Sequence, residues 1–227
     1  MALHKTGKQL WTAVDEYFRG LLAPADKYLE AVVKANRKSG LPAIDVSPLQ
    51  GQHLNILVRM TQPKRVLEIG TLGGYSTICM ARALPVGGRI VTLEFSPRHA
   101  EVARKNLKNA GVLDRVDLRV GPALHILPIL QSEGAGPFDF IFVDADKQSN
   151  AEYVKWALRL SRVGTTIVVD NVVRDGKVVD GKSKDPDIVG TRRMAELVAN
   201  EPRLSATVVQ NVGVKGYDGF LIAVVVS

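Results

Sequence analysis

Short apolar runs alternate with longer amphipathic stretches through most of this chain, from about residue 65 onward. The apolar runs are rich in β-branched and aromatic residues and end in turns, which is typical of buried strands. The stretches between them repeat their apolar positions every three or four residues, which predicts helices. We therefore predict strands at 65–70, 89–94, 115–120, 138–144 and 165–170, with helices near 75–84, 97–110, 122–131 and 150–160.

The connections between these strands determine the fold class. They are long enough for helical crossovers, so successive strands are expected to run parallel and to connect in the right-handed sense. A parallel sheet is covered by helices on both faces. The predicted fold is a doubly wound α/β sheet that is mostly parallel.

The end of the chain departs from this alternation. The segments RLSATVVQ and YDGFLIAVVV are separated by only NVGVKG, which is too short for a helical crossover. The last two strands are therefore predicted to form an antiparallel hairpin.

The first 62 residues have helical rather than alternating patterning, around 8–22 and 26–38 and again after Ser47. Ser47 can cap that third helix, and Pro48 can occupy its first position. We expect one domain over the 227 residues, in which 1–62 form a helical cover and 63–227 form the sheet unit.

Charge and composition exclude some classes of partner. The net charge is +7, but the basic residues are scattered among acids and form no long basic run, so no nucleic-acid partner is expected. The densest basic region, 174–193, is also rich in Gly and Asp and is predicted to be a loop, either a solvated surface loop or one that receives an acidic acceptor.

No apolar run is long enough to span a membrane, and the first residues lack the apolar core of a secretory signal. Cys79 is the only cysteine, which excludes an intrachain disulfide and fits a reducing compartment, so a cytoplasmic location is expected. Cys79 itself is predicted to be buried and inert.

The turn after the first strand, in VLEIGTLGGYST, has the glycines of a ligand-binding turn but not the dinucleotide pattern. Leu72 and Tyr75 stand where G-x-G-x-x-G requires its second and third glycines. Glu68, Gly70, Gly73 and Gly74 build this turn.

Glu94 ends the second strand, roughly twenty residues beyond that turn, where a carboxylate can bind two ribose hydroxyls. A turn for a carboxylate and an acid for a ribose together indicate S-adenosylmethionine. The alternative is that the glycines only make a tight turn and that Glu94 caps the next helix. A third turn at 121–128, GPALHILP, is predicted to border the adenine.

Acidic residues end the fourth and fifth strands. Asp144, Asp170 and Asn171 are predicted to present three oxygen ligands to one hard divalent cation such as Mg²⁺ if those strands are neighbours. Lys147 would then lie beside the cation, where positive charge makes a neutral amine available as a base. The alternative is that Asp144, Asp146 and Asp170 are helix caps or members of a surface ion pair.

Four motifs, VLEIGTLGGYS, VTLEFSP, FDFIFVDADK and IVVDNVV, resemble in order and spacing the cation-dependent O-methyltransferases of the catechol and caffeoyl-CoA type. The resemblance implies a seven-stranded class I methyltransferase sheet with a reversed last strand, and a homodimer. It also implies a site for a divalent cation, Mg²⁺, Mn²⁺ or Ca²⁺.

The same resemblance assigns roles to residues. It places Glu68, Gly70, Gly74, Tyr75 and Ser76 around the methionine part of the cofactor, Glu94 at the ribose, Gly121, Pro122 and Ala123 on the adenine side, and Asp144 at both cofactor and cation. Asp144, Asp170 and Asn171 match the cation ligands, and Lys147 matches the general base.

The predicted activity is transfer of a methyl group to one of two vicinal hydroxyls on a small catechol-type aromatic. The nearest alternative is the same reaction on a caffeoyl-CoA-type ester, but QSNAEY after Lys147 departs from the Asn-Tyr pair usual in that branch. A non-catalytic cofactor-binding protein is disfavoured by the complete set of ligands and base. A nicotinamide oxidoreductase is disfavoured by Leu72 and Tyr75.

Overall fold

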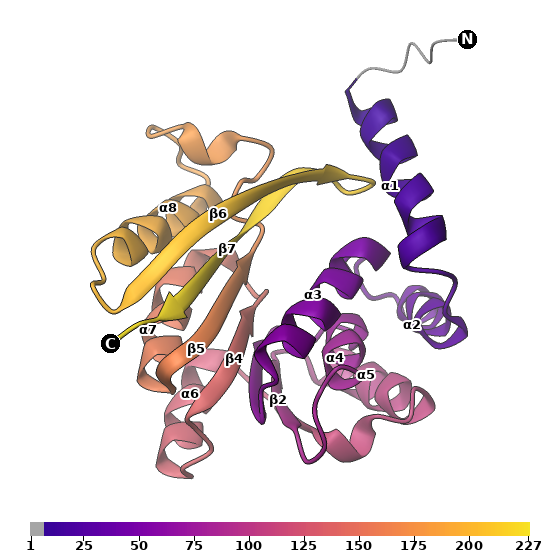
Figure 1. Ribbon diagram of the computed structural model, residues 1–227, viewed down its shortest axis with the longest axis horizontal. Helices are drawn as coiled ribbons and strands as arrows, with labels where there is room; N and C mark the ends of the chain where they lie inside the picture. The colour runs from indigo at the N-terminus through magenta and orange to yellow at the C-terminus, as the bar shows by residue number, and fades with distance from the viewer. Residues whose placement is uncertain (1–6) are drawn as a thin grey trace.

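The computed structural model describes residues 7–227 and shows one seven-stranded sheet in the order β3-β2-β1-β4-β5-β7-β6 (Figure 1). The pairs among β1 to β5 are parallel, and β7 runs antiparallel to both β5 and β6. The strands are β1 (Arg65–Ile69), β2 (Arg89–Glu94), β3 (Val116–Val120), β4 (Phe138–Val143), β5 (Ser161–Asp170), β6 (Leu204–Gly213) and β7 (Gly216–Val225). The predicted doubly wound α/β class is confirmed, with the reversed last strand.

Alternate residues of the central strands point into two separate cores. On β4, Phe140 and Phe142 face one core, whereas Ile141 and Val143 face the other. Both sets are almost completely buried, which explains why this strand has an uninterrupted apolar sequence.

Helices cover both faces of the sheet (Figure 1). One core is closed by α2 (Lys27–Lys38), α3 (Pro48–Thr61), α4 (Tyr75–Ala81) and α5 (Pro97–Asn109). The other is closed by α6 (Ala123–Ser132), α7 (Asn150–Arg159) and α8 (Pro186–Ala199). Single 3₁₀ turns lie at Leu113–Arg115, Lys147–Ser149 and Lys177–Val179.

The opening helices begin where their capping residues predict. Ser47 accepts a hydrogen bond from the backbone N–H of Gln50, and Pro48 occupies the first turn of α3. Asp26 caps α2 in the same way. In contrast, α1 (Lys8–Leu22) has no buried residue and projects to one side of the sheet, near the turn between β6 and β7 (Figure 1).

Two local predictions were wrong. The fifth strand begins at Ser161 rather than at residue 165. The region 174–193 is not a loop throughout, because α8 begins at Pro186 behind an Asp185 cap. The Gly and Asp residues of this region are typical of a loop, and the helical spacing of the buried residues Ile188, Met194 and Val198 was therefore missed.

Over residues 7–227, no helix combines the length and the apolar character needed to cross a membrane.

Candidate active site

Four strand ends meet at one edge of the sheet. Ile69 pairs with Leu93 on one side and with Val143 on the other. Val143 in turn pairs with Val169. The residue that follows each of these positions therefore lies at the same edge, which brings Gly70, Glu94, Asp144 and Asp170 into one row.

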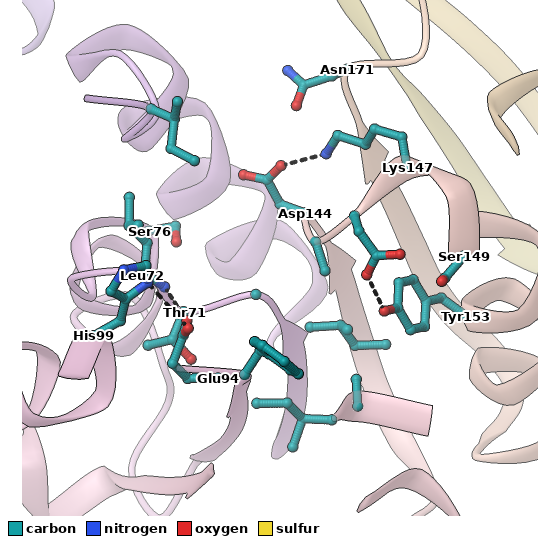
Figure 2. A pocket seen from close by; sticks show the side chains of 18 of the residues that line it. Thr71, Leu72, Ser76, Glu94, His99, Asp144, Lys147, Ser149, Tyr153 and Asn171 are labelled. Carbon is teal, nitrogen blue, oxygen red and sulfur yellow. Dashed lines mark hydrogen bonds and ion pairs between the residues drawn. The ribbon is translucent and has the colours of Figure 1, made fainter. Parts of the chain in front are cut away.

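Gly70 occupies a position that no other residue fits. Its φ is +104°, and a Cβ there would lie 2.3 Å from the carbonyl oxygen of Asp144. Its backbone N–H donates to the carbonyl of Leu93, which fixes the turn against β2. The turn forms part of the wall of a cavity of about 790 Å³ (Figure 2).

Glu94 faces this cavity with both oxygens held by backbone donors. Oε2 accepts from the N–H of Leu72 at 2.7 Å, and Oε1 accepts from the N–H of Ser96 at 2.9 Å. His99 Nδ1 lies 3.3 Å from Oε1 (Figure 2). A carboxylate has about four acceptor directions, so two remain for a pair of hydroxyls.

Glu68 lies beneath the cavity rather than on its wall. It is fully buried and accepts hydrogen bonds from the hydroxyls of Ser76, Thr77 and Thr92 at 2.5 to 2.6 Å. Burial raises the pKa of Glu68 to about 7, against the effect of these three donors. Glu68, which lies in β1, therefore connects this strand with α4 and β2 beneath the cavity.

The other residues expected around the methionine part fall into two groups. Gly70, Tyr75 and Ser76 line the cavity. Gly74 does not, and it packs instead toward Ala103 and Leu107 of α5.

The adenine side was expected at Gly121, Pro122 and Ala123, and all three line the same cavity.

Two aromatic residues that the sequence analysis did not name also line this cavity. They are Phe95, which is 74% exposed, and Tyr153. Tyr153 is buried and donates to Asp146 at 2.5 Å (Figure 2), and burial and this acid raise its pKa, so the phenol stays neutral. Phe95 directly follows Glu94, so its position could have been anticipated, whereas Tyr153 sits within a helical pattern and carried no signal of its own.

A second cavity, of about 450 Å³, adjoins the first. Asp144 and Asn171 line both cavities, and Asp170 lines the second. The expected convergence of the fourth and fifth strand ends is therefore present in the structure.

Asp170 is an almost fully buried carboxylate next to another acid. It is 3% exposed, and burial together with the negative charge of Asp144 raises the pKa of Asp170 to about 7. Two carboxylates and the Asn171 amide form an oxygen donor set that fits a hard divalent cation, and a cation there would offset the mutual repulsion of the acids. Among residues 7–227 no three His, Cys, Asp or Glu side chains form a metal-binding group, so such a site depends on the amide.

Lys147 joins this cluster from the 3₁₀ turn after β4. Its Nζ donates to Asp144 Oδ1 at 2.8 Å (Figure 2), and the side chain is buried. Gly190 of α8 packs on the backbone of this turn, where a Cβ would lie 2.3 Å from the Lys147 carbonyl oxygen. A buried amine thus lines the larger cavity beside Asp144, which lines both.

Gln50 is a member of the second cavity that the sequence did not indicate. Its Nε2 donates to Asp170 Oδ2 at 2.5 Å, across 120 positions of the chain. The sequence around Gln50 showed only the signals of a helix start.

Cys79 is buried, as predicted, and burial raises the pKa of its thiol to about 12.

Comparison with known sequences identifies related proteins over nearly the whole chain. The profile of a family described as O-methyltransferase matches residues 22–222. A catechol O-methyltransferase of Niastella koreensis is 52% identical over 217 residues, covering 96% of this chain and 98% of the relative. Caffeoyl-CoA O-methyltransferase 1 of Eucalyptus globulus is 42% identical over 131 residues, covering 57% of this chain and 53% of the relative.

Solved structures agree in fold. The O-methyltransferase of Bacillus cereus in complex with SAH has a TM-score of 0.94 and is 55% identical, with 96% of this chain and 99% of that chain covered. The O-methyltransferase TomG of Streptomyces achromogenes in complex with SAM has a TM-score of 0.95 and is 47% identical, with 98% and 100% covered.

Proposed function

The chain belongs to the O-methyltransferase family and is an S-adenosylmethionine-dependent enzyme. From this premise we propose that it methylates one of two vicinal hydroxyls on a small catechol-type aromatic. We also propose that the reaction requires a divalent cation. The observation that carries the proposal is the junction of the two cavities at Asp144 and Asn171. A cofactor on one side and an acceptor on the other would meet at this junction.

We assign the larger cavity to S-adenosylmethionine. Glu94 would bind the ribose hydroxyls with its two remaining acceptor directions, because its backbone partners already fix its orientation. Gly70, Tyr75 and Ser76 would surround the methionine part, and Gly121, Pro122 and Ala123 the adenine side.

We assign the second cavity to the acceptor. Asp144, Asp170 and Asn171 would hold Mg²⁺, Mn²⁺ or Ca²⁺ at its inner end. A bound divalent cation supplies positive charge that favours the phenolate form of a contacting hydroxyl. Two vicinal hydroxyls would both reach it, which fixes the orientation of the ring.

The chain itself supplies a base and alignment. Lys147 would take the proton of the reacting hydroxyl, since its Nζ lies beside Asp144, which lines both cavities. The acceptor oxygen would then form a bond to the methyl carbon while the bond from that carbon to sulfur breaks, and S-adenosylhomocysteine would be the other product. The contribution of the protein is mainly positioning and electrostatics.

The test compares kcat/KM for catechol, phenol and guaiacol at one Mg²⁺ concentration, and again in excess EDTA. We expect turnover of catechol alone, and loss of that turnover in EDTA. Comparable efficiency for all three acceptors would overturn the chelation proposal, and full turnover in EDTA would overturn the cation requirement.

A caffeoyl-CoA-type ester is the second candidate, because relatives with that activity match part of the chain. Arg174, Lys177, Lys182 and Lys184 would then hold the CoA phosphates. Arg174, however, already pairs with Asp187 at 3.0 Å. Caffeate and caffeoyl-CoA compared as acceptors distinguish the two, and a strong preference for the thioester would favour the second candidate.

We propose that the enzyme is a homodimer that buries α1 and the edge strand β6. Apolar side chains of α1 are exposed in the single chain: Leu10, Val14, Tyr17, Phe18, Leu21 and Leu22. On β6, Val208, Val209 and Val212 are exposed as well. A second copy would remove both surfaces from water. Light scattering coupled to gel filtration measures the mass, and a monomer at micromolar concentration would contradict the proposal.

We also propose a cytoplasmic enzyme that acts on small molecules rather than on nucleic acid or a membrane. The single, buried cysteine suits a reducing compartment, and the basic residues are dispersed among acids. Fractionation of the producing cells tests the location.

A further inference from the structure

Gln50 links the helical cover to the acidic strand ends. It lies in the first turn of α3, and its Nε2 donates to Asp170 Oδ2 at 2.5 Å. The other oxygen of Asp170 accepts from the backbone N–H of Asn171 at 2.8 Å. Each carboxylate oxygen therefore has one donor, and together the two donors fix the plane of the group.

The position of the Gln50 amide is set by packing rather than by a flexible loop. Ser47 caps the helix through the Gln50 backbone N–H. At the next residue, Gly51, a Cβ would lie 2.8 Å from Cys79 Sγ and 3.0 Å from Tyr75 Cε1. The start of α3 thus packs closely on α4, which fixes the backbone from which the Gln50 side chain reaches Asp170.

An amide is suited to this position because it donates without adding charge. A lysine at position 50 would neutralise Asp170 and compete with a cation, whereas an apolar residue would leave a buried carboxylate oxygen without a donor. The neutral amide satisfies one acceptor direction of Asp170 and leaves the negative charge of the Asp144 and Asp170 pair available.

We propose that Gln50 is a positioning residue that orients Asp170 for the divalent cation, so that the contact of α3 with α4 sets the affinity for the cation. This inference rests on the proposed cation requirement. Groups that orient metal ligands in this way typically change metal affinity by about 10 to 100-fold when they are removed.

The experiment measures Mn²⁺ binding by calorimetry on cofactor-free protein. Gln50→Met keeps the length of the side chain and removes the donor, and Gln50→Asn keeps the donor but shortens its reach. Both variants are expected to raise the Kd for Mn²⁺ by about 10 to 100-fold, the range for groups that hydrogen-bond to a metal ligand. Gln52→Met is the matched control, because Gln52 lies on the same helix and lines neither cavity.

A second measurement separates positioning from damage to the fold. Binding of S-adenosylhomocysteine without a cation is expected to match the wild type in all three variants. The melting temperature should match in Gln52→Met and fall modestly in Gln50→Met, because Asp170 loses one donor. If wild type binds no Mn²⁺, the cation requirement and this inference both fall. If wild type binds and Gln50→Met binds equally well, or if Gln52→Met is weakened as much, only the role of Gln50 is overturned. Should Gln50→Met not fold, Gln50→Asn decides alone, and an unchanged Kd for that variant would also overturn it.

Discussion

Lys147 Nζ lies 2.8 Å from Asp144 Oδ1, and both residues belong to the segment that follows β4. Asp144 lines both cavities, so this partly buried ion pair connects the proposed cation site with the proposed base. Because the two charges are in contact, a change at either residue alters the electrostatic environment of the other.

Lys147→Met is expected to bind S-adenosylhomocysteine with nearly normal affinity and to lose methyl transfer. The loss of a positioned base costs about 10² to 10⁴ in rate. Calorimetry and transfer of a labelled methyl group measure the two properties separately. Lys155→Met removes an exposed lysine that pairs with Glu152, and it should retain full activity. Normal turnover by Lys147→Met would remove the base assignment.

Asp170→Asn is expected to lower kcat by at least about 10²-fold even at saturating Mg²⁺, because the variant loses one of two charged ligands. Chelation of wild type should have the same effect, and added Mg²⁺ should reverse it. The measurement is a Mg²⁺ titration of initial rates. A variant whose rate recovers fully at high Mg²⁺ would show that Asp170 affects affinity alone.

Glu94→Gln is expected to weaken cofactor binding and to spare catalysis at saturating cofactor. A hydrogen bond to a charged group is worth about 1.5 to 3 kcal/mol, so the Kd for S-adenosylhomocysteine should rise by roughly 10 to 150-fold. Glu101→Gln, on the exposed face of α5, is the control. A normal Kd with a reduced kcat would reverse the assignment of the two strand ends.

Glu68 should make the stability of the cofactor-free protein depend on pH. Its folded-state pKa of about 7 exceeds the ordinary value of 4.5, so the folded state holds the proton more tightly. The contribution of Glu68 is fully present below pH 4.5 and is lost as the pH rises to about 7, by about 3 kcal/mol in the free energy of unfolding.

Glu68→Gln removes this titratable carboxyl and should make the dependence between pH 5 and pH 8 shallower, while Asp170, whose pKa is also raised to about 7, keeps its own contribution. Urea unfolding at both values measures the difference for the two proteins. An equal pH dependence in wild type and variant would place the titration elsewhere.

Gly190→Ala is expected to displace the turn that carries Lys147. The added Cβ would lie 2.3 Å from the Lys147 carbonyl oxygen, and overpacking of this kind costs about 1 to 3 kcal/mol. The melting temperature and kcat should both fall. Gly20→Ala in α1 meets no atom of the same chain within 4 Å, so it should preserve kcat, and the melting temperature should not fall because alanine favours a helix over glycine. Unchanged kcat in Gly190→Ala would show that the turn tolerates the shift.

Much of the fold could be predicted from local patterns. The parallel strands, the crossover helices and the final hairpin follow from the period of apolar residues and the length of connections, which are properties of neighbouring positions. Ser47 and Pro48 likewise locate the start of α3, because capping acts within one turn. The helix α8 was not predicted, because the Gly and Asp residues of the segment before it indicated a loop and outweighed the helical spacing of its apolar residues.

The sequence by itself determined which chemistry the strand ends carry, since Glu94, Asp144, Asp170 and Asn171 follow apolar runs that must lie side by side in a parallel sheet. Only the tertiary structure decided how those groups are held. The bond from Gln50 to Asp170 spans 120 positions, and the burial of Glu68 depends on hydroxyls from α4 and β2. Such contacts have no local period, because they arise when helices and strands distant in the chain are packed at a fixed distance.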